Sequence, residues 1–157
     1  WIKGDNMSYF IVFQNKTFKE ESNGSYLWAP KKNKAGRTCF HWTNMKKVKE
    51  GDIIFSVYRR NIVSVNIAKS RCIDATQPKE LNEVNLWEND GWLVKAEYNI
   101  LECPFSIKEN KEEVVKFCAG AYSPFSLSGR GNQGYLYEIS DKFGEYLFNK
   151  TLGRVLC

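Results

Sequence analysis

The sequence has a single histidine, His41, and it lacks the residue groups that most enzyme chemistries need. A metal-dependent nuclease of the His-Asn-His type requires at least two histidines. A catalytic triad or a Cys/His pair would have to use His41, which stands between Phe40 and Trp42 without a supporting motif. No Walker loop or dinucleotide-binding fingerprint is present. We therefore predict a binding domain with no catalytic residues and no cofactor.

The five cysteines do not form a recognisable metal site. None of them stands in a CxxC or Cys/His spacing typical of zinc ligands, so no bound metal is expected. Several stand beside apolar residues, which is typical of buried free thiols in a reducing compartment. No apolar run approaches membrane-spanning length and no signal peptide is recognisable, so we expect a cytoplasmic protein with no membrane partner.

Positive charge is unevenly distributed along the 157 residues. The segment from Lys31 to Arg71 holds eleven basic and two acidic residues, whereas the segment from Cys72 onward holds nine basic and thirteen acidic residues. Such a basic field indicates a polyanionic partner, most simply nucleic acid, with a solvated lysine-rich surface as the alternative. The residues expected at the nucleic-acid backbone are Lys31, Lys32, Lys34, Arg37, Arg59, Arg60, Arg130 and Asn132.

The pattern of apolar residues predicts one α+β domain. Residues 1–6 are expected to be a tag or linker remnant and residues 7–157 a single domain. Strands are predicted at 8–14, 53–58, 62–70, 92–103 and 135–139, with a shorter strand or loop edge at 25–28. Short helices are predicted before residue 47, over 106–117 and after Ser140, and a loop over 15–24. About five or six strands with two or three helices favour a small curved mixed sheet or open β-barrel with short helices at its rim.

Three tryptophans stand in or beside polar loops. Trp28 lies within residues 25–30, and Trp87 and Trp92 flank the polar residues 88–91. Tryptophans in such positions can form walls that stack on a flat ligand, and packing over the core is the alternative use. The glycine-rich stretch 129–134 can likewise present backbone N–H groups to a phosphate, or simply form a tight loop that needs positive φ.

Together these segments resemble the PUA-like superfamily, especially its EVE and YTH branches. The resemblance runs over most of residues 8–139. It includes the opening strand, the loop that leads to Trp28, and residues 45–55 (MKKVKEGDIIF), which are similar to the entry to the second strand of those domains. The Trp87–Trp92 spacing before a long strand is similar to the part of YTH domains that supplies walls of an aromatic cage.

The resemblance implies an open β-barrel that encloses a methylated base between tryptophans. Carried over, the matching cage positions are Trp28, Trp87 and Trp92. The polar residues expected to read the base edge are Ser56, Asn44 and Asp90, with Asn66 and Asn89 as further candidates. The basic loop 31–37 and the glycine-rich loop 129–134 have no clear YTH counterpart, so the RNA preference of that branch need not transfer.

Four functional hypotheses follow. The leading one is a module that recognises a methylated or hydroxymethylated base in DNA, flipped into a tryptophan-lined pocket, as the specificity domain of a prokaryotic modification-dependent restriction enzyme. The resemblance of the tail from Tyr135 to nuclease-fused reader domains supports it. The second is a PUA-type RNA-binding module in RNA modification or processing. The third is a small nuclease using Asp74, Glu97 and Glu102, and the fourth is a protein-interaction domain with its tryptophans in the core.

Overall fold

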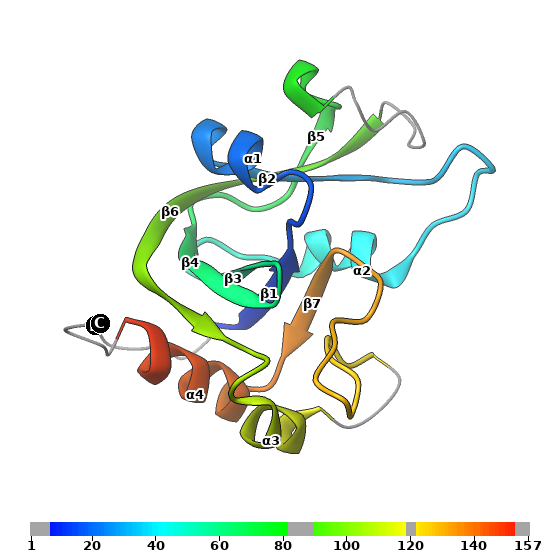
Figure 1. Cartoon of the computed structure of the whole chain (residues 1–157). Helices are drawn as coiled ribbons and strands as arrows, with labels where there is room; N and C mark the ends of the chain where they lie inside the picture. Colours follow the sequence, from blue (N-terminus) through cyan, green and yellow to red (C-terminus); the bar gives the residue numbers. More distant parts are fainter. Residues whose placement is uncertain (1–6, 82–89, 119–121, 153–157) are drawn as a thin grey trace.

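The computed structural model describes residues 7–81, 90–118 and 122–152 of the chain (Figure 1). The strands of this part are β1 (Tyr9–Phe13), β2 (Tyr26–Pro30), β3 (Ile53–Tyr58), β4 (Asn61–Ala68), β5 (Ile73–Thr76), β6 (Asp90–Ser106) and β7 (Leu136–Ile139). Its α-helices are α1 (Phe18–Gly24), α2 (Phe40–Thr43), α3 (Lys111–Val114) and α4 (Asp141–Thr151). Single 3-10 turns span Asn44–Lys47, Lys79–Leu81 and Val115–Phe117. No helix of the described residues is both long and apolar enough to cross a bilayer.

The strands form one mixed sheet in the order β2-β6-β4-β3-β1-β7, with β5 paired to the start of β6. β1 and β3 are parallel, and the other neighbouring strands are antiparallel. The long strand β6 bends so that it pairs with β2 and β5 near its start and with β4 along the rest (Figure 1). The sheet therefore curls into a half-barrel with short helices around it, which confirms the predicted α+β open barrel.

Strand β1 is buried on both faces, as its continuous apolar sequence predicts. Tyr9 and Ile11 belong to a core cluster that includes residues of α4, and Phe10 and Val12 belong to a second cluster on the opposite face of the sheet. Helix α4 lies directly against β1, because a Cβ at Gly144 would stand only 2.1 Å from the Tyr9 ring. The predicted cap of this helix is also present, since Ser140 Oγ accepts a hydrogen bond from the Phe143 N–H at 3.2 Å.

The Gly-Asp pair before β3 joins two strands. The buried carboxylate of Asp52 accepts hydrogen bonds from the N–H groups of Ser8 and Lys49, each at 2.8 Å. Gly51 has a φ of +94°, which a residue with a side chain rarely adopts. Asp52 therefore fixes the residue preceding β1 beside the turn that opens β3, which explains in physical terms why Gly and Asp stand at this point.

Three elements differ from the sequence predictions. Residues 18–24, predicted as loop, form α1, whose Phe18 ring contacts Tyr58 and Tyr98 and whose Glu21 is buried. Strand β5 was not predicted, because its residues are largely exposed and only pairing with β6 orders them. The predicted helix over 106–117 is limited to α3 and one 3-10 turn, because residues up to Ser106 belong to β6.

Strand β6 also continues through Pro104, where the sequence predicts an end. The pairing of β4 with β6 shifts register between the pairs Ile62–Phe105 and Ser64–Ile100. The proline thus stands in an irregular part of the ladder, where its missing N–H removes no regular hydrogen bond.

The cysteines follow the prediction in part. Cys39, Cys72 and Cys118 are free thiols, and Cys118 is buried. Cys103 is disulfide-bonded, which sequence reasoning did not foresee.

A continuous chain of buried polar side chains runs through the interior of the half-barrel. Ser64 Oγ donates to Asn66 Oδ1 at 2.5 Å, Asn66 Nδ2 donates to Ser56 Oγ at 2.7 Å, and Ser56 Oγ donates to Gln14 Oε1 at 2.6 Å. Gln14 Nε2 in turn donates to the carboxyl group of Glu21. Burial raises the pKa of Glu21 to about 8, although hydrogen bonds from Tyr135 and Gln14 oppose this shift.

The buried carboxyl group predicts an unusual pH dependence of stability. The pKa of Glu21 is about 8 in the folded state and 4.5, its ordinary value, in the unfolded chain. Between these two pH values the carboxyl group is therefore protonated in the folded state and ionised in the unfolded chain. The free energy of unfolding should therefore fall between these pH values by up to about 1.4 kcal/mol per pH unit. Urea denaturation at a series of pH values measures this slope.

Glu21→Gln should remove most of the slope, and Glu20→Gln, at the adjacent position on α1, should leave it in place. A wild-type stability that is constant or rises from pH 5 to 8 would contradict the assignment.

Candidate functional site

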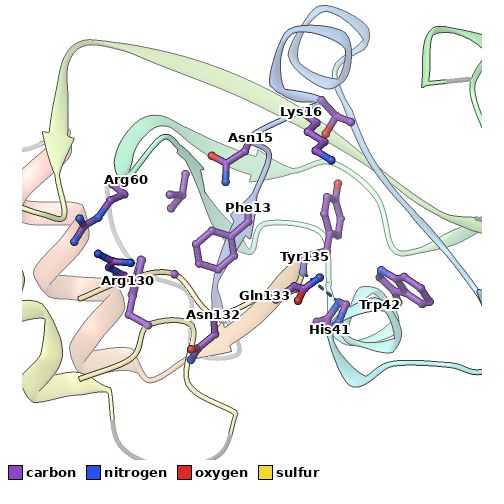
Figure 2. Close-up of a pocket in the computed structure, with 15 residues that line it drawn as sticks. Phe13, Asn15, Lys16, His41, Trp42, Arg60, Arg130, Asn132, Gln133 and Tyr135 are labelled. Carbon is purple, nitrogen blue, oxygen red and sulfur yellow. Dashed lines mark hydrogen bonds between the residues drawn. The ribbon is translucent and has the colours of Figure 1, made fainter. Parts of the chain in front are cut away.

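A cavity of about 640 Å³ opens beside the end of β1 (Figure 2). Its walls come from four segments that are distant in the sequence: the loop after β1, helix α2, the turn between β3 and β4, and the segment before β7. A volume of this size suits a small flat ligand.

Aromatic side chains form one end of the cavity (Figure 2). Trp42 on α2 and Tyr135 before β7 are each only 8% exposed, so their rings are held by surrounding atoms. Phe13, at the end of β1, packs edge-on against Phe125 with the ring centroids 5.6 Å apart. His41 also lines this end, and burial lowers its pKa. This end therefore combines aromatic rings with the imidazole of His41.

Tyr135 holds the aromatic end together. Its hydroxyl lies 2.8 Å from each carboxyl oxygen of Glu21, to which it donates its single hydrogen, and it accepts a hydrogen bond from the Trp28 N–H at 3.2 Å. Its backbone N–H donates to His41 Nδ1 at 3.2 Å, and its carbonyl accepts from the Phe13 N–H at 2.8 Å. One residue therefore fixes two other walls of the cavity and connects them to the buried polar chain.

Two glycines allow the segment before β7 to approach these walls. A Cβ at Gly131 would lie 2.8 Å from the Phe13 ring, and one at Gly134 would lie 2.2 Å from the Tyr137 hydroxyl oxygen. Close packing accounts for these two glycines, whereas Gly129 has the positive φ (+78°) that a tight loop requires.

Cationic side chains form the other end. Figure 2 shows Arg60 and Arg130 on the side of Phe13 away from Trp42, whereas Lys16, on the loop after β1, lies nearer Tyr135. Arg60 donates from one terminal nitrogen to the Gly129 carbonyl at 3.2 Å, and its Nε is buried without a hydrogen-bond partner in the described part of the chain. This end therefore carries positive charge and an unused donor, a combination suited to an anionic group.

The turn that carries Arg60 is strained. Arg59 and Arg60 have φ values of +49° and +64°, in the left-handed region that costs a side-chain-bearing residue roughly 1–2 kcal/mol. Asn and Gly are the residues favoured in such a two-residue hairpin turn. Strain of this kind concentrates at functional sites, so two arginines here point to a role for their side chains.

The tryptophans predicted to form one cage do not face each other. In the pairing of β2 with β6, Trp28 stands opposite Leu93 and Ala29 stands opposite Trp92. Because successive residues of a strand point to opposite faces, Trp28 and Trp92 lie on different faces of the sheet. Trp28 is 1% exposed and its Nε1 donates to the Ala75 carbonyl at 3.0 Å, so it is a core residue. Trp87 lies outside the described residues.

The other predicted pocket residues are also dispersed. Ser56 is fully buried in the polar chain, and Asn44 is buried where its side chain donates to the Leu136 carbonyl at 2.9 Å. Asp90 forms an ion pair with Lys31 at 3.3 Å, and the Lys31 ammonium stands 4.4 Å from the centre of the half-buried Trp92 ring. None of these residues lines the cavity.

The residues predicted at the nucleic-acid backbone divide into two groups. Arg60, Arg130 and Asn132 line the cavity. The others lie in the turn beside it or in and near the exposed loop after β2: Arg59, Lys31, Lys32, Lys34 and Arg37.

The acidic residues weighed for a nuclease do not assemble. Asp74 on β5 forms an ion pair with Lys31 at 2.9 Å. In residues 7–81, 90–118 and 122–152, no group of three or more His, Cys, Asp or Glu side chains is placed to hold a metal ion.

Sequence reasoning missed the aromatic end because its members look like ordinary core residues. Phe13 ends an apolar strand, and Tyr135 begins another. His41 was weighed only as a catalytic residue, yet the adjacent pair His41-Trp42 in a polar setting was a usable signal.

Comparison with known proteins supports the fold. No protein-family model matches the sequence, and no curated protein matches it. Among solved structures, the chain is similar to the YTH domain of the Zygosaccharomyces rouxii MRB1 protein in complex with N6-methyladenosine RNA, with a TM-score of 0.57 and 9% identity over 96% of this chain and 90% of that one. The Pho92 YTH domain in complex with m6A matches with a TM-score of 0.54 and 12% identity over 96% and 89% of the two chains. A hypothetical protein from Leishmania major matches with a TM-score of 0.57 and 8% identity over 94% and 96%.

These likenesses establish that the chain shares its fold with YTH domains, the fold that the sequence resemblance implied. At identities of 8–12%, these structures define the architecture of the chain but not its ligand. The ligand has to be inferred from the residues of the cavity.

The burial of Trp28 predicts a structural role that can be measured. Trp28→Ala should lower the free energy of unfolding by about 3–5 kcal/mol, because it removes a large side chain from the core. Trp92→Ala is the matched control, and its effect should be smaller because Trp92 is only half-buried. Urea denaturation followed by circular dichroism makes the comparison. A Trp28→Ala variant as stable as the wild type would contradict the core assignment.

Proposed function

We propose that this chain is a nucleic-acid-binding module that reads a modified base held in the cavity. The observation that carries the proposal is the presence, in one cavity of about 640 Å³, of an aromatic end and a cationic end. A nucleobase stacks on flat rings, and its phosphates attract cations. Two YTH domains of the same fold were solved with methylated-adenosine ligands, which supports a related role here.

The aromatic end gives a physical reason for preferring a modified base. A methyl group on a base stacked near Trp42 or Phe13 would fill apolar space that an unmodified base leaves empty. Burial of one such group contributes about 0.8 kcal/mol, or roughly a fourfold preference. In a duplex the base must first be flipped out at a cost of a few kcal/mol, which stacking of about 1–3 kcal/mol per base partly offsets.

The finer proposal is that the ligand is DNA with a methylated or hydroxymethylated base. The chain then acts as the non-catalytic specificity domain of a modification-dependent restriction enzyme in the prokaryotic cytoplasm, fused to or associated with a nuclease domain. The support is the basic segment from Lys31 to Arg71 and the resemblance of the tail from Tyr135 to nuclease-fused reader domains.

A second candidate is an RNA-binding module. The observation that favours it is that the two YTH domains named above were solved with N6-methyladenosine RNA and with m6A.

Competition binding separates these possibilities. Fluorescence anisotropy should compare unmodified DNA duplexes with duplexes containing N6-methyladenine, 5-methylcytosine or 5-hydroxymethylcytosine, together with RNA strands with and without N6-methyladenosine. We expect one modified oligonucleotide to bind several-fold more tightly than its unmodified counterpart. Whether that oligonucleotide is DNA or RNA separates the two candidate functions. Equal, salt-sensitive binding of all of them would refute a base-reading function.

Arg60→Gly tests the cationic end without a large loss of stability. The substitution relieves strain at the left-handed turn position, which offsets the lost hydrogen bond to Gly129, so the free energy of unfolding should change by no more than about 1 kcal/mol. Oligonucleotide affinity should fall, and the slope of log affinity against log salt should decrease by about 0.7–0.9, which corresponds to one lost phosphate contact.

Arg71→Ala removes an exposed arginine that does not line the cavity, and it is the control. Equal losses of affinity in the two variants would mean that the cavity arginine has no special role.

A further inference from the structure

We propose that His41 is a specificity-determining residue of the cavity and that its Nε2–H donates a hydrogen bond to an acceptor on the edge of the bound base. The inference rests on the proposed function and deepens it, because it states which chemical group the base must present at this wall. The group is an unprotonated ring nitrogen or a carbonyl oxygen, not an amino group.

A hydrogen bond fixes the orientation of the imidazole. The backbone N–H of Tyr135 donates to His41 Nδ1 at 3.2 Å, shown as a dashed line in Figure 2. A backbone N–H is only a donor, so Nδ1 must carry a lone pair. In a neutral imidazole the other nitrogen then carries the proton. Tyr135 therefore selects the tautomer with hydrogen on Nε2.

The imidazole also stays neutral. Burial lowers the pKa of His41 from its ordinary value of 6.5, so the uncharged form predominates at neutral pH. Aromatic rings surround it: the ring centroid of Phe40 and that of Trp42 each lie 5.5 Å away, and Tyr137 stacks at 6.3 Å. This apolar surrounding favours a neutral donor over a cation.

In this orientation, the Nε2–H group of His41 has no hydrogen-bond partner within the described part of the chain. His41 lines the cavity, and its only hydrogen bond within the described part of the chain is the one at Nδ1. Its Cδ2, the neighbour of Nε2, would lie 3.0 Å from a Cβ at Gly134, so a residue with a side chain there would crowd this edge of the ring. The absence of that side chain leaves this edge of the ring uncrowded at position 134.

A fixed neutral donor discriminates between base edges. A base with an acceptor at this position satisfies Nε2–H, whereas a base with an amino group there leaves two donors facing each other without a partner. Leaving such polar groups unpaired in a closed site is strongly unfavourable. His41 would thus read the identity of the base, while the aromatic rings sense the modification.

Nitrogen NMR of the only histidine tests the donor assignment in the free protein. The chemical shifts of the two ring nitrogens distinguish the Nε2–H tautomer, the Nδ1–H tautomer and the imidazolium ion. We expect the Nε2–H tautomer at pH 7. A dominant Nδ1–H form or an imidazolium ion at this pH would overturn the inference, whatever the protein binds.

Two substitutions then test recognition, with the modified DNA duplex or RNA strand that the wild type binds best as probe. His41→Phe keeps a flat ring without a donor, and its affinity for the probe should fall about tenfold. His41→Gln restores an acceptor for the Tyr135 N–H and a donor beside it, and it should recover most of that loss. Thermal denaturation of both variants checks that the fold is intact.

The outcomes separate the inference from the proposed function. An affinity for the modified probe that is the same in His41→Phe as in the wild type would overturn the role of His41 and leave the base-reading function standing. Loss of affinity in His41→Phe with recovery in His41→Gln, and a shift of the Nε2 resonance when the probe binds, would support the inference. A wild type that binds every oligonucleotide equally would overturn both.

Discussion

The hydrogen bonds of Tyr135 are the constraint on which the candidate site depends. Its hydroxyl reaches the buried Glu21 on α1 and the backbone of β2, while its own backbone holds the end of β1 and the imidazole of His41. Four segments that are distant from Tyr135 in the sequence thus meet at this one residue. Because buried polar groups are costly when unpaired, these contacts specify one arrangement of the walls as well as stabilising it.

The cavity combines a well-packed end with a strained end. At this well-packed end, burial fixes the rings of Trp42 and Tyr135, and Gly131 packs closely against Phe13, which suits the recognition of a flat group of defined shape. At the opposite end, Arg60 is held in a left-handed conformation with a buried, unpaired Nε. An anion at this end would satisfy that donor. The division matches the two parts of a nucleotide, one flat and apolar, the other charged.

The sequence predicted the architecture better than the site. Strongly apolar segments such as β1 and β3, and the capped helix α4, were predictable because burial pattern and local capping decide them. Helix α1 could not be predicted from the sequence, because the residues that hydrogen-bond its buried Glu21 lie outside the helix. The predicted cage paired Trp28 with Trp92, but the register of β2 against β6 places them on opposite faces, and register cannot be read from spacing alone. Arg60 from the basic segment and Arg130 from the glycine-rich loop do line the cavity, and their contact with nucleic acid stays a prediction.

We propose that a modified base enters the cavity between Trp42, Phe13 and Tyr135. The most direct test is amide and indole NMR of the labelled protein titrated with matched modified and unmodified oligonucleotides. We expect the differences between the two titrations to centre on the Trp42 indole and on the amides of Phe13 and Tyr135. Differences that centre instead on Trp28 and Trp92, with those three residues unaffected, would contradict the claim and place the ligand elsewhere on the sheet.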